Sequence, residues 1–107
     1  IINQTYEHLE IIISDDQSTD CTLEIVKQLA LSDKRIKIFV NEITLGYNKN
    51  FERAIGLAAA EYIAIADQDD IWDLDKITQL MSLWNMYKST LIVSSRSVTF
   101  KAGKRVK

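Results

Sequence analysis

The strongest constraint on the fold is a repeated alternation of short apolar runs with segments of helical periodicity. Four runs rich in β-branched residues, typical of buried strands, lie at residues 9–14, 35–40, 61–66 and 90–95. Three intervening segments repeat apolar residues at helical spacing. Their expected apolar faces are Leu23, Val26, Leu29 and Ala30; Phe51, Ala54, Ile55, Ala58 and Ala59; and Ile77, Leu80, Met81 and Trp84. This order predicts an α/β fold, a three-layer sandwich with a mainly parallel sheet.

Length and composition predict a single domain with one modest core. The chain has 107 residues, of which 47% are hydrophobic. We expect residues 1–87 to form the α/β core. Residues 88–107 are expected to add the last strand, a hairpin that turns at 102–103, and a basic tail. Because the sequence starts at Ile1 rather than Met, it is interpreted as a fragment or a processed form of a longer chain.

Several classes of protein fit the composition poorly. No apolar run approaches the roughly 20 residues of a membrane span. A single cysteine, Cys21, excludes an internal disulfide and fits a cytoplasmic location, and a single histidine, His8, makes a zinc site improbable. Residues 88–107 carry 6 of the 13 basic residues and no acid. Because no aromatic stacking platform accompanies these charges, we interpret them as a solvated surface and expect no nucleic-acid partner.

Two acidic clusters follow predicted strands. Asp15 and Asp16 end the first run, and Asp67, Asp69 and Asp70 follow the third. The carboxyl ends of parallel strands meet at one edge of a sheet, so both clusters are expected there. Carboxylates this crowded disfavour their own ionisation unless a cation lies among them, and hard divalent cations favour oxygen ligands.

The two clusters suggest different roles. Asp67 and Asp69, one residue apart at a strand end, are expected to point to one side. A carboxylate at Asp15 or Asp16 can accept hydrogen bonds from a ribose hydroxyl or a base N–H, and Ser18 adds a hydroxyl. Helix capping is the alternative for such acids, and it is favoured for three others. These are Asp20, Asp73 and Asp75. Gly46, in the loop before the second helix, is free to adopt a positive φ.

Three ordered blocks then suggest a family. "NQTYEHLEIIISDDQSTDCTLEIV", "NEITLGYNKNFERAI" and "AAAEYIAIADQDDIWDLDKI" resemble family 2 glycosyltransferases of GT-A fold over roughly residues 3–85. The block "ADQDDIW" resembles the DxD motif of that family, and its wording is similar to rhamnosyltransferase-like members. Two departures are Gln17, where glycine is common, and Leu74, where proline is common.

The resemblance implies inverting transfer of a sugar from a UDP- or dTDP-sugar with the help of Mg²⁺ or Mn²⁺. It implies donor binding by Asp15, Asp16, Ser18, Asn50, Arg53 and Asp67. It implies metal binding by Asp69, supported by Asp67 and Asp70. A glycan or lipid-linked acceptor is expected, together with peripheral association at the inner face of a membrane. The general base is expected outside this chain, in the acceptor half. Self-association through an unpaired strand edge is a further expectation.

Two other classes remain open. In a phosphoacceptor receiver domain, Asp15 and Asp16 would hold Mg²⁺ and Asp67 would accept phosphate. That class needs a lysine after a late strand, where this sequence offers only Arg96. In a non-catalytic module, the basic tail would bind an anionic surface or partner in a salt-sensitive manner.

Overall fold

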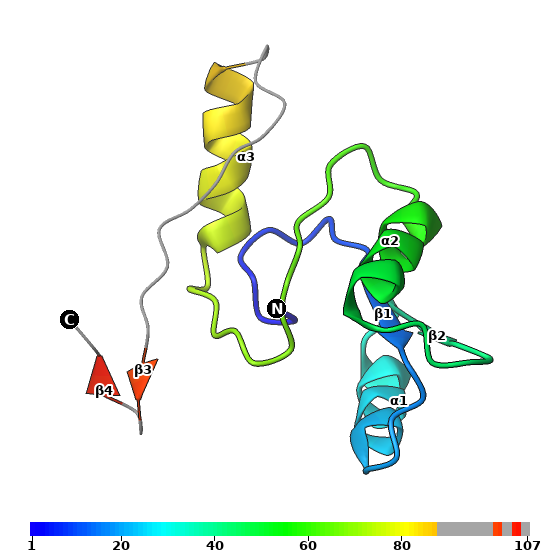
Figure 1. The fold of residues 1–107 in the computed structure, drawn as a ribbon. Helices are drawn as coiled ribbons and strands as arrows, with labels where there is room; N and C mark the ends of the chain where they lie inside the picture. Colours follow the sequence, from blue (N-terminus) through cyan, green and yellow to red (C-terminus); the bar gives the residue numbers. More distant parts are fainter. Residues whose placement is uncertain (88–99, 102–103, 106–107) are drawn as a thin grey trace. The chain divides into compact units, whose positions relative to one another are not determined.

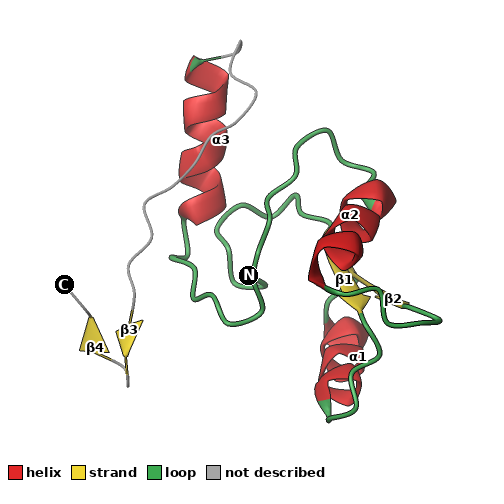
Figure 2. Cartoon of the chain, in the orientation of Figure 1, coloured by secondary structure: helices red, strands yellow, loops and turns green. Residues whose placement is uncertain are grey.

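The computed structural model describes residues 1–87, 100–101 and 104–105. Its elements are β1 (Ile11–Asp15), α1 (Thr22–Ser32), β2 (Ile36–Val40), α2 (Tyr47–Leu57), α3 (Lys76–Met86), β3 (Phe100–Lys101) and β4 (Lys104–Arg105) (Figure 1 and Figure 2). They belong to two compact units. The strand unit comprises Ile2 and residues 7–70, and the α3 unit comprises Ile1, residues 3–6 and residues 71–107. No helix in the described ranges has the length and apolarity needed to cross a membrane.

The strand unit is built on a parallel pair of strands. β1 pairs with β2 in a register that runs from Ile11 opposite Ile36 to Asp15 opposite Val40. Helix α1 connects the two strands and packs against β2, while α2 packs against β1. This arrangement confirms the predicted α/β class with parallel pairing. It also brings the carboxyl ends of β1 and β2 together at one edge, where polar residues follow both strands.

The strand predicted at residues 61–66 is wrong for this structure. These residues pair with neither β1 nor β2, and the side chain of Ile65 is 59% exposed. A β-branched composition favours extended backbone, but a strand also needs a neighbour that supplies hydrogen bonds along its whole length. The isoleucines of β1 are correspondingly half-buried rather than fully buried. The strand predicted at residues 90–95 lies outside the described residues.

The helices of the strand unit begin close to where the sequence places them. Helix α1 has Cys21 at its N-cap, so the predicted cap at Asp20 is wrong by one position. The Asp20 carboxylate instead accepts the N–H of Thr22 at 3.0 Å, a local turn contact. Helix α2 follows Gly46, whose φ of 81° confirms the expected positive value. It ends at Leu57, two residues short of the predicted apolar face.

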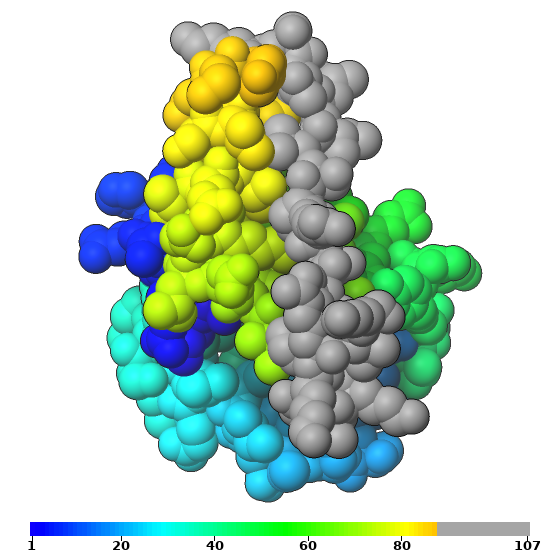
Figure 3. Space-filling view, turned by 90° about the vertical axis from the view of Figure 1, so that its left-hand side faces the viewer, coloured from blue at the N-terminus to red at the C-terminus, as the bar shows by residue number. Residues whose placement is uncertain are grey.

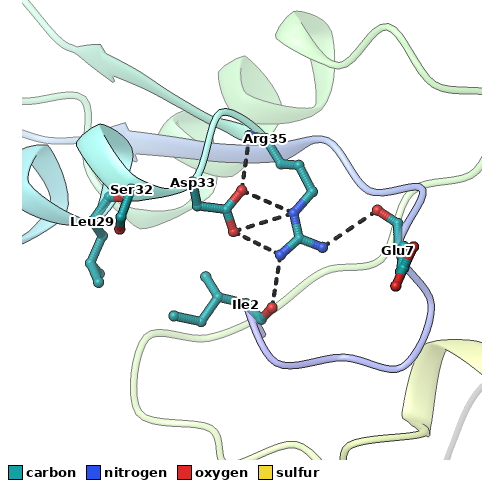
Figure 4. Close-up of polar contacts among 6 residues, drawn as sticks. All are labelled: Ile2, Glu7, Leu29, Ser32, Asp33 and Arg35. Carbon is teal, nitrogen blue, oxygen red and sulfur yellow. Dashed lines mark hydrogen bonds and ion pairs between the residues drawn. The ribbon is translucent and has the colours of Figure 1, made fainter.

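The turn between α1 and β2 is fastened by Arg35 (Figure 4). Its Nε and Nη2 atoms donate to the Asp33 carboxylate, with Nη2 at 2.7 Å from Oδ2. The guanidinium also donates to two backbone carbonyls, to Ile2 at 2.8 Å through Nη2 and to Glu7 at 3.4 Å through Nη1. The hydrogen bonds from Arg35 lower the pKa of Asp33 from 3.8 to about 2. One arginine therefore holds the start of the strand unit to the turn that leads into β2.

The α3 unit is organised by a residue far from α3 in the sequence. Gln4, only 6% exposed, accepts the N–H of Ile77 at 3.0 Å and donates to the carbonyl of Asp73 at 2.6 Å. Asp75 lies at the N-cap position, but its carboxylate accepts the side-chain N–H of Gln79. Gln4 therefore supplies the capping contact that the sequence assigned to Asp73 or Asp75.

Helix α3 presents the predicted face. Ile77 is buried, and the other three members of that face, Leu80, Met81 and Trp84, are half-buried. The residues on its other side are exposed, as is Met86 at its end. Figure 3 shows α3 as part of the molecular surface, in yellow. In the same unit β3 and β4 form an antiparallel pair, which confirms the predicted hairpin arms. The turn residues at 102–103 lie outside the described residues.

Candidate functional site

The carboxyl ends of β1 and β2 hold two buried polar residues. Asp15 ends β1 with 5% of its surface exposed, and Asn41 directly follows β2 with 3% exposed. The N–H of Asn41 donates to the Asp15 carbonyl at 2.9 Å, which extends the strand pairing by one step. The Asp15 carboxylate accepts the backbone N–H of Ser18 at 3.1 Å. This contact stabilises the turn that leads from β1 toward α1.

Asn41 lies at the centre of a hydrogen-bond network with Ser14, Asp16, Asn50 and Arg53, called here the Asn41 network. Its side-chain amide donates to Asp16 at 2.6 Å and to Asn50 Oδ1 at 2.9 Å. Its Oδ1 accepts a hydrogen bond from Arg53 Nη1. Asn50 is held in turn by Ser14, which donates to it through Oγ at 2.7 Å and accepts from it through the carbonyl at 2.9 Å. Three residues predicted for donor binding thus meet through one that was not predicted.

Asp16 also fixes the loop between β2 and α2. Its Oδ1 accepts the N–H of Leu45 at 2.7 Å, and its Oδ2 accepts the N–H of Gly46 at 2.8 Å. The hydrogen bond from the Leu45 amide, followed by that from Asn41, lowers the pKa of Asp16. The carboxylate is therefore ionised at neutral pH and holds the loop with its negative charge.

Gln17, in the turn after β1, contacts the segment that follows β2. It has a φ of 64°, a left-handed conformation that favours glycine. Its side-chain amide donates to the carbonyls of Asn41 at 3.3 Å and of Glu42 at 2.5 Å. These two bonds offset the strain of the backbone, which accounts for a glutamine at a position where glycine is common in the family it resembles.

The second acidic cluster forms a turn rather than a strand end. The N–H of Asp70 donates to the Asp67 carbonyl at 3.2 Å, so residues 67–70 make one tight turn. The alternation expected for Asp67 and Asp69 at a strand end therefore does not apply. Asp67 is half-buried, whereas Asp69 and Asp70 are exposed and accept no hydrogen bond from the described residues.

Tyr47 connects this turn to the loop that Asp16 holds. Its hydroxyl donates to Asp67 Oδ1 at 3.2 Å. The hydrogen bond to Asp67, with the negative charges of Asp67 and Asp69, raises the pKa of Tyr47. Since Gly46 immediately precedes Tyr47, a short path of contacts runs from Asp16 to Asp67 within the strand unit. The two acidic clusters, 52 residues apart in the sequence, are linked by this path.

The sequence reasoning missed Asn41 and Tyr47. Asn41 had a usable signal, because it is the first residue after the run at 35–40 and so ends a strand as Asp15 and Asp16 do. Tyr47 had none, since its contact depends on where the turn at residues 67–70 lies. Beside the Asn41 network is a pocket of about 320 Å³. It is lined by Val40, Asn41, Glu42, Ile43, Leu45 and Arg53.

Asp67 and Asp69 fit a metal ion whose coordination shell is completed by a bound ligand and waters. In the part of the chain that the structure describes, no group of three or more His, Cys, Asp or Glu side chains is arranged to hold a metal ion. A Mg²⁺ or Mn²⁺ ion bound with a diphosphate needs only one or two protein carboxylates, because waters and phosphates supply the remaining oxygens. The exposed Asp69 and the oriented Asp67 meet that smaller requirement.

These features define an α/β unit with acids at the carboxyl edge of a parallel pair of strands. Comparison with protein families agrees with this class. The model of "Glycosyl transferase family 2" matches residues 1–107. The chain belongs to this glycosyltransferase family, and the match decides against the receiver-domain alternative.

Relatives with curated descriptions are glycosyltransferases. The chain is 33% identical over 107 residues to the UDP-Glc:alpha-D-GlcNAc-diphosphoundecaprenol beta-1,3-glucosyltransferase WfgD of Escherichia coli, covering 94% of this chain and 42% of the relative. It is 46% identical over 71 residues to an uncharacterized glycosyltransferase of Haemophilus influenzae, covering 66% of this chain and 22% of the relative. It is 41% identical over 71 residues to a GalNAc(5)-diNAcBac-PP-undecaprenol beta-1,3-glucosyltransferase of Campylobacter jejuni, covering 65% of this chain and 23% of the relative. The chain thus spans less than half the length of these relatives.

Proposed function

We propose that this chain is the donor-binding half of an enzyme that transfers a sugar, with inversion, from a nucleoside-diphosphate sugar to an acceptor hydroxyl. The observation that carries the proposal is the path of contacts from Asp16 through Gly46 and Tyr47 to Asp67. It ties a cluster suited to a nucleoside to a cluster suited to a metal diphosphate. In a nucleotide sugar the diphosphate directly follows the nucleoside and joins it to the sugar, so adjacent nucleoside and metal-diphosphate clusters match the order of its parts.

The nucleoside end is assigned to the edge formed by β1 and β2. Asp15 or Asp16 accepts an N–H of the base, and Ser18 lies next to them. Asn50 and Arg53 face the nucleotide from α2. Support for this assignment comes from the Asn41 network, which fixes the Arg53 guanidinium and Asn50 before any ligand binds. Preorganised donors lose less entropy on binding than mobile ones.

The diphosphate of the donor is assigned to the turn at residues 67–70. Asp69 is the principal ligand of a Mg²⁺ or Mn²⁺ ion, Asp70 supports it, and Asp67 faces the ribose or a metal-bound water. A metal held by these carboxylates would supply positive charge to neutralise the leaving nucleoside diphosphate. Exposure of Asp69 and Asp70 in a tight turn supports this role, because both carboxylates are accessible to an arriving ligand.

The acceptor and the general base are assigned outside this chain. Two relatives are named for acceptors linked to diphosphoundecaprenol. A lipid-linked or glycan acceptor, reached from the cytoplasmic side of a membrane, is proposed here on that basis. UDP-glucose is the first donor to test, because the same E. coli relative is named for it, and a dTDP-linked deoxyhexose such as rhamnose is the second.

Nucleotide titration tests the proposal. UDP and dTDP are titrated into the 107-residue chain with and without Mn²⁺, and into Asp69→Ala and Asp73→Ala. We expect Mn²⁺-dependent binding in the parent and in Asp73→Ala, which removes an exposed carboxylate outside the turn. Asp69→Ala is expected to weaken binding at least tenfold. A folded parent chain that binds neither nucleotide would overturn the proposal for this chain.

A further inference from the structure

Tyr47 combines an exposed position with an unusually defined orientation. It is 67% exposed, yet its hydroxyl donates to Asp67 and its ring packs on that of Phe51. The two ring centroids are 4.8 Å apart with an interplanar angle of 57°. A tilted aromatic pair of this kind restricts the side-chain torsions of Tyr47. The hydroxyl therefore points at Asp67 with less loss of rotational freedom than an isolated exposed tyrosine would incur.

The backbone at Tyr47 is fixed as well. The N–H of Gly46 donates to Asp16 at 2.8 Å, and the carbonyl of Gly46 accepts the N–H of Asn50 at 3.0 Å in the first turn of α2. The φ of 81° at Gly46 turns the chain so that α2 starts with Tyr47. Asp16 thereby holds the backbone from which the side chain that contacts Asp67 extends.

The three acids of the turn differ because of this contact. Asp67 Oδ1 accepts the Tyr47 hydroxyl, whereas Oδ2 accepts no hydrogen bond from the described residues. A tyrosine hydroxyl is protonated at neutral pH, so Tyr47 acts as the donor in this contact. Asp67 is thus oriented through Oδ1, while its Oδ2 is left without a hydrogen-bond donor among the described residues. The carboxylates of Asp69 and Asp70 accept no such hydrogen bond from the described residues.

We propose that Tyr47 is a positioning residue, which orients the Asp67 carboxylate for the metal-bound donor and couples it to the nucleoside end of the site through the loop held by Asp16. This inference rests on the proposed function and adds to it a residue that acts through Asp67 rather than by touching the donor. Outer partners of ligating groups commonly change metal affinity by 10- to 100-fold when removed. Since Tyr47 is exposed, a smaller effect of about threefold to tenfold is expected for Tyr47→Phe.

A double-mutant cycle tests the proposal. UDP is titrated with Mn²⁺ into the parent, Tyr47→Phe, Asp67→Asn and the double variant, with Tyr87→Phe as a matched exposed control. We expect Tyr47→Phe to weaken binding by about threefold to tenfold and to have no further effect in the Asp67→Asn background. Tyr87→Phe and the thermal midpoint of Tyr47→Phe should both stay at the parent value. Unchanged affinity in Tyr47→Phe, or equal losses in both backgrounds, would overturn the positioning role.

A ligand-free measurement keeps this test separate from that of the function. The near-ultraviolet tyrosine spectrum should shift on Asp67→Asn in the parent and not in the Tyr47→Phe background. Identical shifts in both backgrounds would contradict the contact itself. If the parent binds no nucleotide with Mn²⁺, the function and the role of Tyr47 both fall. If the parent binds and Asp69→Ala loses binding while Tyr47→Phe is unaffected, only the role of Tyr47 falls.

Discussion

Replacing Asn41 by alanine should be the most damaging single change at the carboxyl edge of β1 and β2. Asn41 is 3% exposed, and its side chain donates two hydrogen bonds and accepts a third. Alanine removes all three and leaves Asn50 Oδ1 and the Arg53 guanidinium each with one bond fewer. The backbone N–H of Asn41, which bonds to Asp15, is retained, so the change isolates the side chain.

The magnitude follows from the number of bonds. A net 0.5–1.5 kcal/mol for each of three hydrogen bonds gives a loss of about 2–4 kcal/mol in the free energy of unfolding. For a chain of this size, that loss corresponds to a fall of at least about 8 °C in Tm. Asn41→Asp should be destabilising at neutral pH as well, because it places a second carboxylate 2.6 Å from Asp16 in place of a donor.

Urea unfolding followed by circular dichroism measures the effect, with a constant m-value as the check that compactness is unchanged. Asn48→Ala on α2 is the matched control, because Asn48 is exposed and should change stability by less than about 0.5 kcal/mol. If Asn41→Ala cost no more than Asn48→Ala, the network would not stabilise the fold and the reasoning from its hydrogen bonds would be refuted.

Three further changes probe separate features. Gln17→Ala should lose about 1–2 kcal/mol of stability in urea unfolding, and Gln17→Gly should recover about 1 kcal/mol of that loss by relieving the positive φ; equal stability of the two variants would contradict a strained backbone. Gln4→Ala should cost about 1–3 kcal/mol and increase hydrogen exchange in the first turn of α3, whereas protection as in the parent would exclude a capping role for Gln4. The depressed pKa of Asp33 means that its pairing with Arg35 contributes stability above about pH 4 and loses it as the pH falls toward about 2. Arg35→Gln should therefore flatten the fall in stability across that window, Arg35→Lys should keep part of it, and a parent-like acid profile in Arg35→Gln would disprove the assignment.

Much of the local structure could be predicted from the sequence, because it depends on neighbouring residues. Helical spacing of apolar residues is a property of one segment, and α3 buries or half-buries every member of the predicted face. The positive φ of Gly46 follows from its lack of a Cβ. The parallel pair of β1 and β2 follows from two β-branched runs separated by one helix. The predicted strand at residues 61–66 was wrong because its composition determines the extended preference but not the presence of a pairing partner.

At the candidate site, the sequence predicted the types of residue present but not the contacts between them. The sequence by itself determined which acids follow which runs, and hence that an oxygen-rich cluster forms at the end of β1. Only the tertiary structure decided that Asn41 joins Asp16 to Arg53, that Tyr47 holds Asp67, and that Gln4 caps a helix 73 positions away. Each of these contacts joins residues that are distant along the chain. Their meeting depends on strand register and on the path of the loops, and neither of these is encoded in a local pattern.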